Sequence, residues 1–208
     1  TEEGTVILND SGADNPLGIR INQKSYADAS FETRNAVVFH YTLVNESGSD
    51  LSGLYAGLFF DWDIVDPLIN SAHYNADYQM VYAQDLTENP THLAGTMLLN
   101  LSLGANIDAM HDWGDDIYSY SDETKWSHMT GGVNDESAFN VNVSTYTGIG
   151  PVDIATGDSI SFGIAALAAS SIYELEYVAS EIRNFWDTHF PEELGNGNEE
   201  TLPGVFAL

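Results

Sequence analysis

Apolar residues occur along this 208-residue chain in short segments, and the clearest of these alternates between two faces. In residues 37–44 the odd positions share one face of a strand and the even positions share the other. Because both faces are largely apolar, we expect an interior strand. Residues 45–50, Asn-Glu-Ser-Gly-Ser-Asp, favour a turn. The sequence therefore predicts a hairpin with a second strand over 54–64.

Similar strand composition recurs along the chain. Further strands are predicted over 5–8, 17–26, 77–83, 92–101, 149–154 and 159–167. The segment Ala-Thr-Gly-Asp between the last two strands favours another hairpin turn. Residues 104–134 are rich in Asp, Ser, Tyr and Gly and have weak periodicity. For them we expect long loops with one or two short helical turns.

One helix is predicted near the end of the chain. Ser171 and Glu174 have the spacing of a capping box, and apolar residues follow at three- and four-residue intervals until Pro191 ends the pattern near Phe190. The sequence thus predicts an all-β fold, an antiparallel β-sandwich with one C-terminal amphipathic helix. It divides the chain into a module over residues 1–190 and a flexible linker over 191–208.

The net charge of the chain excludes some classes of binding partner. The chain has 32 Asp and Glu residues against 5 Lys and Arg, which gives a net charge of -27, and it has no cysteine. A surface this acidic repels phosphate backbones and anionic lipid. We therefore expect neither nucleic-acid binding nor membrane insertion. The acids are compatible with calcium ligation, with a surface adapted to high salt, or with solubility alone.

A calcium site is predicted at the end of the strand over 54–64. Asp61 and Asp63 share one face of that strand, with Cα atoms roughly 6.5 to 7 Å apart, and Asp66 follows where the strand ends. The three carboxylates could offer oxygens to one Ca²⁺, although the spacing differs from that of an EF-hand loop. The alternative is that these acids simply bond backbone amides or water.

A second group of candidate binding residues lies in the predicted loop region. It combines an imidazole, carboxylates and indoles, as a metal site or a sugar-binding rim does, and consists of His111, Asp112, Trp113, Asp115, Asp116 and Trp126. The alternative is a solvated loop in which acids and aromatics cluster by chance. Trp62, in contrast, is predicted to face the core.

Catalytic signatures are missing from the sequence. There is no Gly-x-Ser-x-Gly elbow, no His-Glu-x-x-His, no glycine-rich phosphate loop and no cysteine nucleophile. The six histidines have no ligand spacing. We therefore expect no catalytic residue in this module.

Three segments resemble parts of large secreted bacterial proteins. Residues 202–208, Leu-Pro-Gly-Val-Phe-Ala-Leu, resemble the linker that leads into a type A C-terminal sorting domain of type IX secretion substrates. Residues 54–64 and 150–165 resemble blocks of β-rich accessory regions that accompany subtilisin-like peptidase and sorting domains. The resemblance implies a module cut just before a sorting domain, and it carries over no active-site residue.

These observations lead to one expected function with two alternatives. We expect a non-catalytic accessory module of a secreted or outer-cell-surface bacterial protein, stabilised by Ca²⁺ and in contact with neighbouring domains of its parent chain. One alternative is a carbohydrate-binding module whose partner is a polysaccharide. The other is a free-standing hydrolase or lyase.

Overall fold

The computed structural model describes residues 2–30, 33–86, 90–111, 121–134 and 137–191. Within them, the larger of two antiparallel sheets has the strand order β1 (Glu2–Asn9), β2 (Ile19–Ala27), β3 (Ala36–Asn45), β11 (Ser159–Ala169), β7 (Leu93–Leu98), β6 (Met80–Asp85), β5 (Asn70–Asn75) and β9 (Ala138–Val141). The smaller sheet has the order β4 (Leu51–Trp62), β10 (Val143–Ile154) and β8 (Ala105–His111). The helices are α1 (Asp122–Thr130) and α2 (Ile172–His189), with short 3₁₀ helices η1 (Pro67–Ile69) and η2 (Leu101–Leu103).

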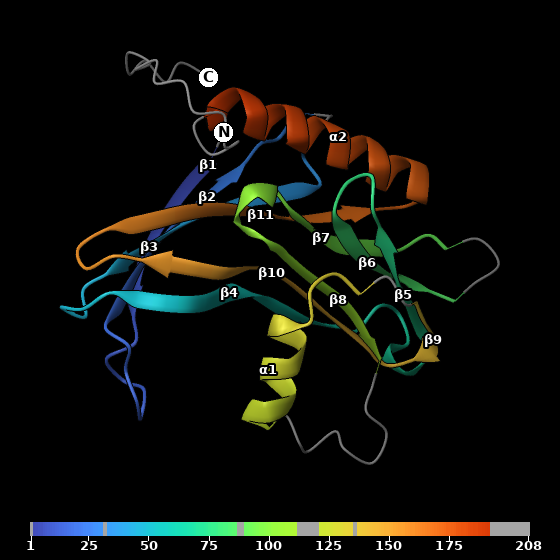
Figure 1. The fold of residues 1–208 in the computed structure, drawn as a ribbon. Helices are drawn as coiled ribbons and strands as arrows, with labels where there is room; N and C mark the ends of the chain where they lie inside the picture. Colours follow the sequence, from blue (N-terminus) through green and yellow to red (C-terminus); the bar gives the residue numbers. More distant parts are fainter. Residues whose placement is uncertain (1, 31–32, 87–89, 112–120, 135–136, 192–208) are drawn as a thin grey trace.

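The elements stack in layers. Helix α2 lies on one face of the eight-stranded sheet, the three-stranded sheet lies on the other face, and α1 lies on the outer side of the small sheet (Figure 1). This arrangement confirms the predicted antiparallel β-sandwich with a C-terminal helix. No helix in the described part of the chain is long and apolar enough to cross a membrane.

The core between the two sheets follows from the alternation of side chains along the strands. Tyr41 and Leu43 of β3 point toward the small sheet, whereas Val38 of the same strand packs under α2. β3 pairs with β2 and β11, so the prediction of an interior strand is confirmed. Across the two sheets the Thr96 and Thr147 hydroxyls are 2.7 Å apart and form a buried hydrogen bond.

Helix α2 begins as the capping pattern predicts. The Ser171 hydroxyl accepts a hydrogen bond from the Glu174 amide at 3.2 Å. The Glu174 carboxylate reaches one residue further back than a capping box requires, and accepts from the Ser170 amide and hydroxyl, which lowers its pKa. The apolar face ends in Trp186, which is fully buried against Gly163 of β11.

Both predicted hairpins are wrong. β3 belongs to the large sheet and β4 to the small one, and β10 and β11 are separated in the same way, so each of these turns crosses from one sheet to the other. Asn45 stabilises both crossings: its side-chain amide donates to Ser49 O and Ile154 O, and its backbone carbonyl accepts from the Gly157 amide. Turn chemistry fixes where the chain reverses but not which strand it then pairs with.

Three other predicted boundaries also need correction. Residues 104–134 contain a seven-residue strand, β8, before they reach α1, whereas only loops and helical turns were expected. The strand predicted over 77–83 is displaced, because residues 76–79 form a turn between β5 and β6. β10 begins six residues before the predicted strand over 149–154. β8 was missed because two of its inward residues, Ala105 and Ala109, are small, so that their alternation with Asn106 and Asp108 gives little hydrophobic contrast.

Candidate functional site

The outer face of the small sheet gathers aromatic and acidic side chains from three strands. Strand registers align Phe59 of β4, Tyr146 of β10 and Asp108 of β8 in one row across the sheet. Asp61 and Ser144 form the next row, and the Ser144 hydroxyl donates to the Asp61 carboxylate at 3.2 Å. The residues next to them along each strand point inward to the core. Side chains alternate between the two faces of a strand, so these five residues point outward.

Asp108 links this face to α1. Its two carboxylate oxygens have different partners: Oδ2 lies 2.5 Å from His128 Nδ1, and Oδ1 accepts from the Asn134 side-chain amide at 3.0 Å. Asn106 on the same strand accepts from the Gly132 amide and donates to Gly150 O. These polar contacts hold the end of α1 and the segment after it against β8.

Tyr146 fills the centre of the face. A Cβ atom added at Gly57 or Gly148 would lie 2.5 or 2.3 Å from the Tyr146 hydroxyl, so these two glycines leave the space in which the ring lies flat on the sheet. Burial raises the pKa of the Tyr146 phenol. Among the described residues its hydroxyl has no hydrogen-bond partner. Tyr146 is thus a packing residue beneath α1.

Aromatic side chains remain exposed around this buried centre. Phe59 on β4 is 46% exposed and Trp126 on α1 is 55% exposed. The Trp126 ring meets the half-buried Tyr55 ring edge to face, with centroids 5.3 Å apart. Tyr55, Phe59 and Trp126, with the exposed Asp61 beside them, are called here the aromatic surface.

The predicted group of loop residues contributes Trp126 to this surface. His111 is the last residue of β8, and Trp126 lies in the middle of α1. The other predicted members, Asp112, Trp113, Asp115 and Asp116, lie outside the described residues. Trp62 faces the inter-sheet core as predicted, and its indole N–H donates to Thr145 Oγ1 at 2.8 Å.

The predicted calcium ligands have local roles near the end of β4. Asp61 accepts from Ser144, while Asp66 caps η1 by accepting from the Leu68 amide at 3.1 Å. The buried Asn70 side chain fixes the loop between them through bonds to the backbone of Ile64 and Asp66. Asp63 is exposed. Within the described ranges, no three His, Cys, Asp or Glu side chains are grouped so as to hold a metal ion, and the Ca²⁺ site stays a prediction.

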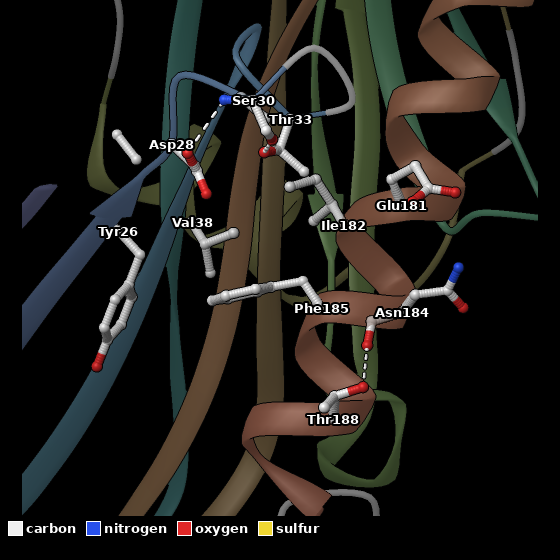
Figure 2. A pocket seen from close by; sticks show the side chains of 12 residues that line it. Tyr26, Asp28, Ser30, Thr33, Val38, Glu181, Ile182, Asn184, Phe185 and Thr188 are labelled. Carbon is white, nitrogen blue, oxygen red and sulfur yellow. Dashed lines mark hydrogen bonds between the residues drawn. The ribbon is translucent and has the colours of Figure 1, made fainter. Parts of the chain in front are cut away.

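A hollow lies on the opposite side of the molecule from the aromatic surface, between α2 and the strands β2 and β3. It encloses about 440 Å³, and Figure 2 shows Phe185 and Val38 pointing into it while the polar ends of Glu181 and Asn184 point away. The hydroxyl of Thr188 donates to a backbone carbonyl of its own helix. The hollow thus combines the apolar Phe185 and Val38 with the polar Asp28, Ser30 and Thr33, and it is separate from the aromatic surface.

Sequence reasoning missed several residues of the candidate site. The alternation that assigns Asp61 to the outer face of β4 also assigns Tyr55 and Phe59 there, so that signal was present in the sequence. Asp108 and His128 gave no such signal. They are 20 residues apart, in a strand and a helix, and only the tertiary fold brings them together.

Comparisons with known proteins bear on the fold. No protein-family model matches the sequence, and no curated protein matches it either. Among solved structures, a bacterial glucoamylase complexed with acarbose is similar over 91% of this chain, with 16% identity and a TM-score of 0.54. A putative aldose 1-epimerase from Klebsiella pneumoniae matches over 94% of this chain and 56% of its own, with 10% identity and a TM-score of 0.41.

The similarity to the glucoamylase concerns only part of that enzyme. The present chain spans 25% of the glucoamylase chain. At 16% identity the comparison shows a shared fold and carries over no residue role. It agrees with the β-sandwich described above.

Proposed function

We propose that this chain is a non-catalytic accessory module that binds polysaccharide through its aromatic surface. The observation that carries the proposal is the exposure of Phe59 and Trp126, from two different elements, on the side of the small sheet that also carries Asp61. Flat aromatic rings stack on the apolar faces of sugar rings, and a carboxylate accepts hydrogen bonds from sugar hydroxyls.

The dimensions of the surface suit an extended ligand. Tyr55 and Phe59 are four residues apart on one strand, so their Cα atoms are separated by about 13 Å. Trp126 stands beside Tyr55 and widens that end of the surface. A chain of sugar units lying along β4 would contact the rings in turn. The fold's occurrence within a glucoamylase structure that contains acarbose is compatible with a carbohydrate ligand.

The polar groups beside the aromatic surface support binding in preference to catalysis. Both carboxylate oxygens of Asp108 already accept hydrogen bonds, and the Tyr146 phenol is buried. A general acid or base needs to reach the reacting atoms of its substrate. In our proposal Asp108, His128 and Tyr146 instead fix the position of α1, and the module acts next to neighbouring domains of a secreted or surface-exposed parent protein.

Calcium belongs to the proposal as a stabilising ligand. Asp61 and Asp63 lie on the exposed side of the chain at the end of β4, and one oxygen of Asp66 is engaged in capping η1. A hard cation bound there would also draw oxygen ligands from backbone carbonyls and water. Its effect would appear as thermal stabilisation that depends on these acids.

Isothermal titration calorimetry against a panel of soluble polysaccharides tests the proposed function. We expect Trp126→Ala to weaken binding about tenfold, equivalent to about 1.4 kcal/mol. Tyr173→Ala is the matched control, because Tyr173 is 82% exposed but lies on α2. The proposal is wrong if no polysaccharide binds, or if Trp126→Ala and Phe59→Ala bind as tightly as the unchanged chain.

A further inference from the structure

Strand β1 is an open edge of the eight-stranded sheet. All eight of its residues are exposed, and Val6, Ile7 and Leu8 are exposed by 46%, 64% and 47%. β1 pairs with β2 in unbroken register, and its other side pairs with no strand among the described residues. Native edge strands are commonly protected by charged residues, above all lysine, by proline or by a bulge. β1 has no lysine, proline or bulge, and its only charged residues, Glu2 and Glu3, are its first two.

The backbone groups that β1 leaves open can be identified from the neighbouring ladder. The Asp10 amide donates to Ile19 O at 3.4 Å, and the Glu46 amide donates to Gly18 O at 2.9 Å. Hydrogen-bonded pairs alternate along antiparallel strands. The even residues of β1 therefore bond to β2, while the N–H and C=O groups of Glu3, Thr5, Ile7 and Asn9 point outward.

The two faces of β1 differ in polarity. Val6 and Leu8 lie on the face that continues the inter-sheet core, because Leu8 aligns with Ile21, which packs against that core. Ile7 lies on the opposite face, together with the polar Glu3, Thr5 and Asn9. A partner strand must therefore be apolar on the face of Val6 and Leu8 and must offer outward backbone groups at alternate residues. Another copy of β1 meets both requirements.

We propose that two copies of this chain associate through β1 in antiparallel register. A two-fold axis perpendicular to the sheet keeps like faces together, so the residue numbers of each opposed pair add to an even number. With the axis at Val6, the two Val6 residues oppose each other. Thr5 then exchanges hydrogen bonds with Ile7 of the second copy, and Glu3 does so with Asn9. This register joins the outward groups and buries Val6 and Leu8 on one face.

The charge distribution permits self-association at this edge. The hairpin of β1 and β2, residues 2–27, contains four of the 32 acids but two of the five bases, so its net charge is -2 in a chain of net charge -27. Repulsion between two acidic molecules at this hairpin is thus weaker than the net charge of the whole chain implies. Salt screens the remaining electrostatic repulsion, so association must strengthen as ionic strength rises.

The geometry also limits the assembly to a dimer. A two-fold contact uses the open edge of both copies, so no β1 edge is left for a third. The other edge of the large sheet is β9, which has only four residues. Pairing of β1 with β9 of another copy would instead produce open chains.

Disulfide trapping tests this register, because the chain has no cysteine of its own. Opposed residues of a non-hydrogen-bonded pair have Cα atoms about 4.5 Å apart, within the range of a disulfide. We expect Val6→Cys to form a covalent dimer on mild oxidation. Leu8→Cys is the matched control, because Leu8 is equally exposed but its copies would lie about 13 Å apart in this register. Equal cross-linking of the two variants would refute the register.

Sedimentation measurements on the 208-residue chain test the association itself. We expect a monomer–dimer equilibrium that shifts toward dimer with added NaCl. Thr5→Pro removes an outward N–H and should give a monomer, whereas Thr5→Ala keeps that N–H and should still dimerise. Circular dichroism checks that both variants are folded. A monomer at every concentration and salt level, equal dimerisation of both variants, or assemblies larger than a dimer would overturn the proposal.

Discussion

The contact between Gly163 and Trp186 provides a direct test of how α2 packs on the large sheet. A Cβ atom added at Gly163 would lie 2.3 Å from the Cη2 and Cζ3 atoms of the fully buried Trp186 ring. The ring cannot move aside freely, because it stacks on Phe190 with centroids 4.4 Å apart and also meets His40. Overpacking of a rigid core costs about 1 to 3 kcal/mol. We expect Gly163→Ala to lower the melting temperature by about 2 to 12 °C in a domain of this size.

A double-mutant cycle separates this clash from other effects of the substitution. Trp186→Phe removes the indole atoms Cη2, Cζ3 and Cζ2, which lie 2.3, 2.3 and 2.8 Å from the added methyl group, so Gly163→Ala should cost less in that background. Urea denaturation followed by circular dichroism gives the four free energies of unfolding. We expect a favourable coupling of about 0.5 to 3 kcal/mol. If the free-energy changes of the two single variants add to that of the double variant within about 0.5 kcal/mol, a clash with the Trp186 indole does not explain the effect of Gly163→Ala.

Three further predictions concern titration, metal and the end of the chain. Burial raises the pKa of Tyr41 from 10.0 to about 12, so the unfolded chain releases this proton at a lower pH than the folded chain does. The free energy of unfolding should therefore fall as the pH rises from about 10 to about 12. The fall should be less steep in Tyr41→Phe, and denaturation at a series of pH values tests this. Ca²⁺ at 100 times its dissociation constant should stabilise the fold by about 2.7 kcal/mol. That shift should exceed the effect of NaCl at equal ionic strength and disappear in Asp63→Asn; an equal shift would indicate charge screening alone. Limited proteolysis followed by mass spectrometry should remove residues 192–208 with little change in melting temperature, and unfolding after trimming would contradict the linker prediction.

The sequence predicts those parts of the fold in which side-chain periodicity is set by one buried face. The alternation over 37–44 places β3 correctly in the sheet interior, and the capping residues of α2 fix where that helix begins. The turn over 45–50 is correctly located, but its strands belong to different sheets. A local turn signal carries no information about long-range pairing, because the pairing is decided by which faces must be buried together.

The candidate site was less accessible from sequence. Trp126 was predicted to bind a ligand, whereas Phe59 was not, although Phe59 shares the outer face of β4 with Asp61. Asp108 was hidden in a segment whose polar composition suggests loops. Its partner His128 lies in a helix with weak apolar character. Contacts of this kind depend on tertiary proximity, which single-sequence periodicity does not encode.

Helix α1 has a consequence for how the aromatic surface responds to a ligand. None of its residues is buried, and the hydrogen bonds of His128 to Asp108 and of Gly132 to Asn106 hold it to the sheet. Apolar burial, which gives most helices their stability in a domain, contributes little here. Opening of α1 therefore requires only a fraction of the free energy of global unfolding. The backbone amides of α1 should exchange with deuterium well before those of β10, and a ligand that stacks on Trp126 should slow that exchange while leaving β10 unaffected.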